Sequence, residues 1–193
     1  MIEIVPLWNQ IQKRPDILMH ASIYQWAAKI FQPGWVMDLG SEMGIGAALM
    51  ESVNEEIEVI AYDINLVSLQ ASTECIEEKV IKRIQGDGAF LPLGSNTLTG
   101  ICLVNTIHIT EDPEKILYEC CRVLKPGSHA VICIPTRQLP VRWHIKTLSE
   151  NIHNLAVELF SDFFLPDHIS NKLTGHRWEV GLDADLYVTV CMK

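Results

Sequence analysis

The chain has 193 residues, which is enough for one domain with a sizeable core and too few for two comfortable ones. The hydrophobic fraction of 48% and the charged fraction of 20% are those of an ordinary globular protein. The net charge of −9 argues against non-specific nucleic-acid binding, which needs a basic surface, and against attraction to anionic membranes.

The first half of the chain predicts helices and strands in alternation. Apolar residues recur on one helical face from 16 to 31, and Pro33 with Gly34 ends that helix. Asn65 is suited to cap a later helix. The elements expected after the first helix are a strand at 36–39, a helix at 44–53, a strand at 58–62, a helix at 65–79 and a strand at 80–85.

The second half continues this pattern and then changes it. Asp112 is suited to cap a helix with Pro113 at its first position, where a missing N–H costs nothing. The remaining expected elements are strands at 98–105 and 129–135, a helix at 145–159, and strands at 174–180 and 185–192. The turn between the last two strands is too short for a crossover, so we expect them to pair with each other in antiparallel orientation.

Alternating strands and helices indicate an α/β fold, with a mostly parallel sheet covered by helices on both faces. We find no repeat, low-complexity tract or linker, and we expect one domain over residues 1–193. Within it we distinguish an N-terminal helical cap at 1–32, a core at 33–136, and a helix plus closing antiparallel strand pair at 137–193.

Three carboxylates lie at the carboxyl ends of successive predicted strands: Asp38, Asp63 and Asp87. Parallel strands bring their carboxyl ends to one edge of the sheet, where ligands bind in open α/β folds. Asp63 comes 23 residues after Gly40, the spacing at which an acid accepts both hydroxyls of a ribose. Asp87 could accept a hydrogen bond from an exocyclic amine and Asp38 could hold an ammonium group. An amine, a ribose and an adenine together describe S-adenosylmethionine.

Four segments at matching spacing resemble those of a known family. Val-Met-Asp-Leu-Gly at 36–40 resembles its first motif, and Ala-Tyr-Asp-Ile-Asn at 61–65 its second. Segment 85–93 is similar to the adenine-binding loop, and 110–127 matches the helix and Arg-Val-Leu-Lys-Pro-Gly turn before the fifth strand. The chain thus resembles class I S-adenosylmethionine-dependent methyltransferases of the ubiquinone/menaquinone-biosynthesis type (methyltransferase type 11). The resemblance implies their Rossmann-like sheet with a reversed C-terminal strand.

The resemblance also implies roles for individual residues. Asp63 would bind the ribose hydroxyls, and Ile64 would pack on the adenine. The residues implied for the adenine amine are Asp87, Gly88 and Ala89. The residues implied for the methionine part are Asp38, Gly40, Ser41, Gly44 and, at the end of the fourth strand, Asn105.

Glu42 departs from the family pattern, which usually carries a glycine at this position. A side chain here projects toward the methionine part of the cofactor or forces a strained turn. Two alternatives follow. Glu42 either swings aside or pairs with the cofactor ammonium, which preserves binding, or it obstructs the pocket.

His108 follows the fourth strand, where a histidine could act as a general base for the acceptor. Alternatively, His108 has a purely structural role and donates a hydrogen bond to a backbone carbonyl. Methyl transfer relies largely on positioning and desolvation, so no dedicated base is required. The residues that could form an aromatic acceptor pocket, or simply pack helices onto the sheet, are Trp8, His20, Tyr24, Trp143 and His144.

The cysteines and histidines indicate neither disulfides nor a metal site. The six cysteines include no CxxC spacing and mostly lie in apolar patterns, as buried free thiols do. The histidine spacings match no ligand pattern, so we expect no metal. The N-terminus lacks the pattern of a signal peptide, and no run approaches the roughly 18 apolar residues of a membrane span. We therefore expect a cytoplasmic protein.

The sequence favours an enzyme that transfers the methyl group of S-adenosylmethionine to a small-molecule acceptor, with the oxygen, nitrogen or carbon identity of the acceptor atom open. The short segment before the first strand suggests an open cleft, or a homodimer or other partner that completes it. The alternative is a non-catalytic methyltransferase-like binding or scaffold protein, which Glu42 motivates. An NAD-dependent dehydrogenase is excluded because residues 40–45 do not form G-x-G-x-x-G.

Overall fold

The computed structural model describes residues 15–75, 81–135, 154–155, 158–164, 168–170, 177–179 and 186–193. Its helices are α2 (Pro15–Ala27), α3 (Ile45–Val53), α4 (Leu66–Cys75) and α5 (Pro113–Val123), with a 3₁₀ turn η1 (Ile107–Ile109). Its strands are β1 (Gly34–Leu39), β2 (Ile57–Asp63), β3 (Lys82–Gln85), β4 (Leu98–Val104), β5 (Leu124–Pro135), β6 (Asp162–Phe164), β7 (His168–Ser170), β8 (Arg177–Glu179) and β9 (Leu186–Met192). Most of the helix expected at 145–159 lies outside the described residues.

The main sheet has seven strands in the order β3-β2-β1-β4-β5-β9-β6. Strands β1 to β5 pair in parallel, and β9 runs antiparallel to both of its neighbours, β5 and β6. The expected fold class, a mostly parallel sheet with a reversed C-terminal strand, is confirmed.

The expected pairing of the two C-terminal strands is wrong. Strand β8 pairs with β7 in a separate two-stranded sheet, while β9 lies between β5 and β6. A short turn requires the chain to reverse its direction between two strands, but it does not determine which strand each of them pairs with. Val188 and Val190 are fully buried on one face of the sheet and Cys191 on the other, so burial favours an interior position for β9.

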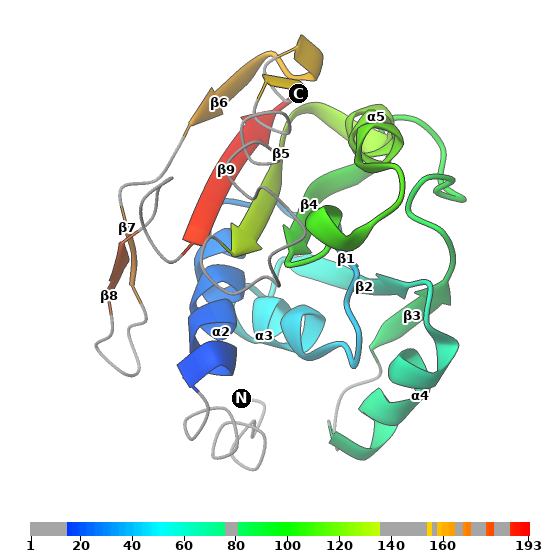
Figure 1. Cartoon of the computed structure of the whole chain (residues 1–193), viewed down its shortest axis with the longest axis vertical. Coiled ribbons are helices and arrows are strands. Elements are labelled where there is room, and N and C mark those ends of the chain that lie inside the picture. The colour runs from blue at the N-terminus through cyan, green and yellow to red at the C-terminus, as the bar shows by residue number, and fades with distance from the viewer. Residues whose placement is uncertain are drawn as a thin grey trace.

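Alternate residues of each strand enter two separate cores. Val36 and Val59 pack with α2 and α3, whereas Met37 and Ile60 pack with α5 on the opposite face. Figure 1 shows α2 and α3 on one side of the sheet and α5 on the other. This three-layer arrangement leaves the carboxyl ends of the parallel strands as the place where a ligand can enter.

Two helices begin at the caps that their residues predict. The Asp112 side chain accepts a hydrogen bond from the Lys115 amide at 3.0 Å, with Pro113 at the start of α5. Asn65 accepts one from the Val67 amide at 3.0 Å at the start of α4. None of the helices in the described part of the chain is long and apolar enough to cross a membrane.

Candidate cofactor site

A cavity of about 780 Å³ opens at the carboxyl ends of β1, β2 and β4. This volume is within the range of cavities that hold one small ligand or cofactor. The residues predicted to bind the cofactor that line this cavity are Gly40, Ser41, Glu42, Asp63, Ile64, Asp87, Gly88, Ala89 and Asn105. The fold therefore brings together segments that are up to 65 residues apart in the sequence.

The turn after β1 has a left-handed backbone at three positions, with φ of 81° at Gly40, 47° at Glu42 and 75° at Gly44. Only glycine adopts this conformation without a steric cost. At Gly40 space is also decisive, because an added Cβ would collide with the side chain of Thr106 at the end of β4. Glu42 occupies the left-handed conformation despite its side chain, so this turn holds strained backbone.

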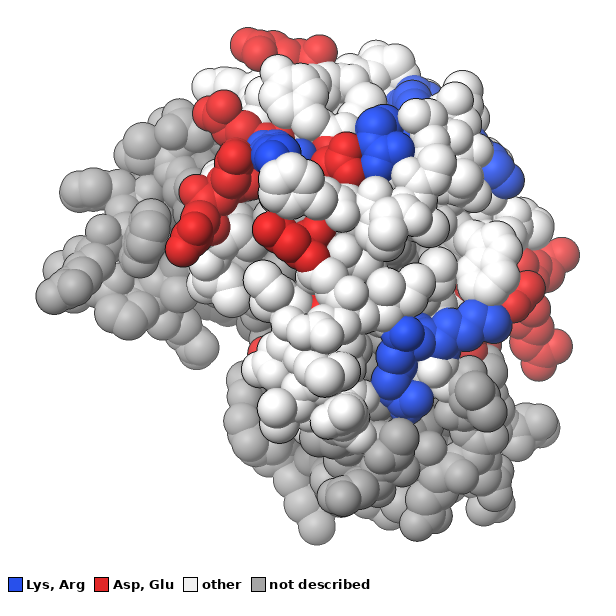
Figure 2. Space-filling view, turned by 90° about the vertical axis from the view of Figure 1, so that its right-hand side faces the viewer, with Lys and Arg blue, Asp and Glu red and all other residues white. Residues whose placement is uncertain are grey.

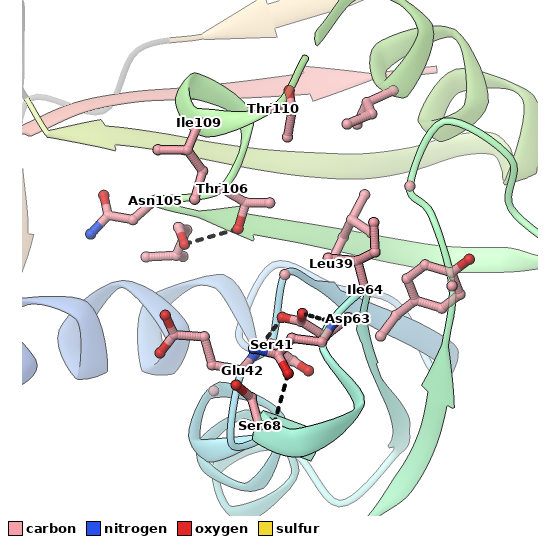
Figure 3. Close-up of a pocket in the computed structure, with 18 of the residues that line it drawn as sticks. Leu39, Ser41, Glu42, Asp63, Ile64, Ser68, Asn105, Thr106, Ile109 and Thr110 are labelled. Atoms are coloured by element: carbon pink, nitrogen blue, oxygen red, sulfur yellow. Dashed lines mark hydrogen bonds between the residues drawn. The ribbon is translucent and has the colours of Figure 1, made fainter. Parts of the chain in front are cut away.

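Asp63 connects two loops at the end of β2 and is only 8% exposed. Its Oδ2 accepts a hydrogen bond from the Glu42 amide at 2.8 Å, and its Oδ1 accepts one from the Asn65 amide at 2.8 Å (Figure 3). An ionised carboxylate has about four lone-pair sites, so it can still accept from two hydroxyl groups. The carboxylate is thus held in place by two amides and can still accept hydrogen bonds from a ligand.

The Glu42 side chain is exposed at the cavity wall. Figure 3 shows its carboxylate extending away from Asp63, although its backbone amide is bonded to that residue. The side chain therefore leaves the Asp63 end of the cavity open. This geometry is compatible with a carboxylate that swings aside or meets a cation.

Asp87 lies at the far end of the cavity beside apolar side chains. Its Oδ1 accepts from the Ala89 amide at 2.9 Å, and its carbonyl accepts from the Tyr62 hydroxyl at 3.2 Å. Ile64 is 68% exposed and Phe90 is 65% exposed at the same cavity. An acceptor group between exposed apolar side chains suits a flat aromatic ligand that carries an amine.

Asn105 also has a left-handed backbone, with φ of 57°. Its Nδ2 lies 2.5 Å from Nε2 of His20, which belongs to α2 and also lines the cavity. Tyr24 of the same helix lines it too. Of the residues expected to form an acceptor pocket, Trp8, Trp143 and His144 lie outside the described part of the chain.

Asp38 does not line the cavity; it is fully buried beneath it. Neither of its carboxylate oxygens has a hydrogen-bond partner of ordinary geometry among the described residues. Burial raises the pKa of Asp38 to about 7, although the Tyr24 hydroxyl and the Ala47 amide lie near enough to oppose this rise in part. Direct contact with a ligand is thus not available to Asp38 here. Gly44 likewise lies outside the lining, toward Ile81.

His108 does not line the cavity, so the geometry gives no support to its expected role as a general base. The 3₁₀ turn η1 rotates successive side chains by about 120°. Ile109, 70% exposed, consequently lines the cavity, while His108 is 6% exposed. Burial lowers the pKa of His108, which disfavours the charged form it would need after accepting a proton.

Several lining residues were not found by sequence reasoning. Thr106 follows Asn105 at the end of β4 and could have been found by the same strand-end rule. Ile109 and Phe90 come after strand ends too, but nothing in their spacing distinguishes them from core residues. Ser68 has no sequence signal, whereas Thr110, Glu111 and Lys115 lie in the segment 110–127 that resembles the family but were not assigned to the site.

The cavity lining is acidic. Its acids among the described residues are Glu42, Asp63, Asp87, Glu111 and Asp112, against one lysine. That lysine, Lys115, places Nζ 3.3 Å from the ring centre of Phe90. Figure 2 shows acidic side chains gathered over the upper half of one face of the molecule, next to basic ones. An excess of carboxylates around a partly enclosed site favours a cationic ligand.

Comparisons with known proteins agree with this geometry. Residues 37–132 match the family model described as a methyltransferase domain. No curated protein matches the chain. One similar solved structure, with a TM-score of 0.70 and 16% identity, is assigned as an S-adenosyl-L-methionine-dependent methyltransferase of Methanococcus maripaludis; the match covers 97% of this chain and 91% of that one.

Two further structures share the fold. An S-adenosylmethionine-dependent methyltransferase of Thermotoga maritima has a TM-score of 0.64 at 16% identity, with 99% of this chain and 100% of that one covered. The cyclase SpnF has a TM-score of 0.63 at 18% identity; the match covers 80% of this chain, which spans 61% of the length of SpnF. The segment 37–132 therefore belongs to the methyltransferase-domain family, and the chain shares the fold of S-adenosylmethionine-dependent methyltransferases of known structure.

Proposed function

We propose that this protein transfers the methyl group of S-adenosylmethionine to a small-molecule acceptor, and that residues 1–193 act as one domain. The observation that carries the proposal is Asp63, a buried carboxylate fixed by two backbone amides at the end of β2 and facing an acidic cavity. A fixed acceptor of this kind suits the paired hydroxyls of a ribose.

The cavity wall also contains polar atoms that lack partners. Ser41 Oγ and Asn105 Oδ1 have no hydrogen-bond partner among the described residues, and Ser41 is only 6% exposed. Buried polar atoms without partners cost free energy, which a polar ligand removes. The charged amino-acid end of the cofactor provides such a ligand, and we assign Gly40, Ser41 and Asn105 to it.

We assign the nucleoside end of the cofactor to residues at the ends of β2 and β3. We assign the ribose hydroxyls to Asp63 and the adenine face to Ile64. The adenine amine is assigned to Asp87, with Gly88 and Ala89 beside it. Gly88 has no side chain to block the ring, and an added Cβ would approach Leu39 to 3.2 Å.

When bound, S-adenosylmethionine supplies a methyl group on a cationic sulfur, open to in-line displacement. The protein contributes position, an acidic environment that favours the cation, and exclusion of water. Among the described lining residues, His20 is the one histidine, so it rather than His108 stands where a proton could be accepted. The acceptor enters from the side of α2 in this proposal, and a partner or second copy would add to the enclosure.

The alternative function is a non-catalytic binding or scaffold protein, motivated by Glu42. The cyclase SpnF has the same fold, so fold alone does not establish methyl transfer. The alternative is not favoured, because the other predicted contacts line one cavity.

Calorimetry with S-adenosylmethionine and S-adenosylhomocysteine tests the proposal first. We expect both to bind with one site per chain. If neither ligand binds at millimolar concentration, the proposed methyltransferase activity is ruled out. Transfer of a tritiated methyl group from the cofactor to pooled small molecules of a cell extract then separates an enzyme from a protein that only binds.

A further inference from the structure

Tyr24, on a helix that lies outside the matched segment 37–132, meets Asp38 at the floor of the cavity. The meeting point is Gly46, the second residue of α3. A Cβ added to Gly46 would lie 2.6 Å from Asp38 Oδ2, and it would collide with the phenol ring of Tyr24. Both Gly46 and Tyr24 line the cavity. Among the described residues, Gly46 and the phenol ring of Tyr24 thus lie next to both the buried carboxylate and the cavity.

The surroundings of Asp38 are unfavourable for an ionised carboxylate. It is fully buried, and neither oxygen has a hydrogen-bond partner of ordinary geometry among the described residues. An ionised carboxylate in that position needs a donor or a cation. The described donors that act on it are the Tyr24 hydroxyl from α2 and the Ala47 amide from the first turn of α3.

The other titratable groups that face this pair do not supply a cation. Asp63 and Glu42 are acids and favour the protonated form of Asp38. Cys102 of β4 and Cys133 of β5 are fully buried, and burial raises the pKa of each thiol, so both stay neutral. None of these groups provides a cation. His20 lies one turn before Tyr24 on α2 and lines the cavity, and the cofactor ammonium is the cation that we expect to meet the ionised carboxylate.

We propose that Tyr24 is a positioning residue whose hydroxyl links Asp38 to the cavity, so that binding of the cofactor ammonium is coupled to loss of a proton from Asp38. The proton passes to solvent, and the carboxylate is left facing the ammonium across Gly46 and the Tyr24 hydroxyl. The inference rests on the proposed function, because it assigns the amino-acid end of the cofactor to this floor.

The coupling predicts a particular dependence of affinity on pH. Asp38 has a pKa of about 7 without ligand, so it is mostly protonated at pH 6 and must lose its proton on binding. The affinity for S-adenosylhomocysteine should then fall about tenfold for each pH unit below 7 and level off near 7.5. Adenosine lacks the amino-acid end and should bind with the same affinity across this range.

The test is calorimetry of S-adenosylhomocysteine and adenosine between pH 5.5 and 7.5, in two buffers of different ionisation enthalpy. We expect close to one proton released per S-adenosylhomocysteine bound at pH 6, and none for adenosine. Equal pH profiles for the two ligands would overturn the inference while the proposed function stood. Absence of binding of S-adenosylmethionine, S-adenosylhomocysteine and adenosine at any pH would instead remove the proposed function.

Tyr24→Phe removes the hydroxyl and keeps the ring against Gly46. We expect about tenfold weaker binding of S-adenosylhomocysteine at pH 7, with the profile moved to higher pH, because ionised Asp38 has lost a donor. Tyr118→Phe is the matched control, since Tyr118 is 55% exposed on α5 and does not line the cavity. An unchanged profile in Tyr24→Phe would contradict the role of the hydroxyl.

Two more variants decide the case if Tyr24→Phe does not fold. Asp38→Asn is nearly isosteric and should flatten the pH profile of S-adenosylhomocysteine while adenosine binding is retained. His20→Gln removes the titratable group one turn before Tyr24 on α2, and the pH profile of S-adenosylhomocysteine binding should remain. A profile lost in His20→Gln and kept in Asp38→Asn would assign the proton to His20 and overturn the inference.

Discussion

The backbone amide of Glu42 donates a hydrogen bond to Oδ2 of Asp63 across 2.8 Å. This contact joins the strained turn after β1 to the end of β2, so the residue proposed to bind ribose also holds the turn proposed to bind the methionine part. The second Asp63 oxygen holds the Asn65 amide, next to the start of α4. The turn after β1 and the turn after β2 are therefore both held by one carboxylate.

Replacement of this carboxylate should weaken both the fold and the site. We expect Asp63→Ala to reduce the affinity for S-adenosylmethionine by about 1–3 kcal/mol, because the ribose hydroxyls lose a charged acceptor. The melting temperature should fall as well, since two backbone amides lose their partner. Glu114→Gln, an exposed acid on α5 outside the cavity, is the control and should change neither. Unchanged affinity in Asp63→Ala would refute the assignment.

Glu42 offers a way to separate backbone strain from charge. Glu42→Gly should raise the free energy of unfolding by about 1 kcal/mol, because a left-handed backbone at φ of 47° no longer carries a side chain. Glu42→Gln keeps the side chain and should leave stability unchanged. Urea unfolding of the three proteins measures the difference.

The same two variants test how Glu42 affects the cofactor. Its exposed carboxylate lies in an acidic wall and extends away from Asp63. We therefore expect both variants to bind S-adenosylmethionine a few-fold more weakly, and S-adenosylhomocysteine, which lacks the sulfonium charge, to be affected less. Tighter binding by Glu42→Gly alone would show instead that the side chain obstructs the pocket.

Gly40 should tolerate no side chain, because an added Cβ meets both a collision and a left-handed backbone. Gly40→Ala drives its Cβ into Thr106, so we expect a loss of about 3 kcal/mol or more of stability and loss of cofactor binding. Gly127→Ala is the matched control: its φ of 76° is similar, but nothing lies within 4 Å of the added Cβ. For Gly127→Ala we expect a loss of about 1 kcal/mol of stability, from backbone strain alone. Similar melting temperatures for the two variants would contradict this account.

Asp38 should make the ligand-free protein less stable as pH rises. Its pKa is about 7 in the folded chain and near 3.8 when unfolded, so between these values the folded state binds more protons. The contribution of this group to stability is therefore fully present below about pH 4 and is lost as pH rises to 7, by as much as about 4 kcal/mol. Asp38→Asn should remove that decline. The check is urea unfolding of both proteins from pH 5 to 8. If the free energy of unfolding changes with pH in the same way in both, the raised pKa of Asp38 is contradicted.

Local patterns were sufficient for much of the fold and for one side of the site. Asp63 ends a strand whose apolar run is clear, and Asp87 follows a short strand with few apolar residues; the strand-end rule places both at the cavity. The cap at Asp112 and the end of β1 at Leu39 follow from side-chain chemistry within a few residues. These predictions needed no knowledge of the distant parts of the chain.

Predictions that depended on packing across the sheet were less successful. The strand at 185–192 could pair with any neighbour, and only burial on both faces determines its place between β5 and β6. The side of η1 that His108 occupies depends on a single 3₁₀ turn. The meeting of Tyr24 and Asp38 requires α2 to lie against α3, which no local pattern indicates.

The central claim is that the cavity at the ends of β1, β2 and β4 holds an adenosyl cofactor. A crystal structure of the chain grown with S-adenosylhomocysteine tests it most directly. We expect electron density for the ligand in this cavity, with the ribose hydroxyls on Asp63 and the adenine amine at Asp87. Density for the ligand elsewhere, or the reverse orientation with adenine at Asn105, would contradict it.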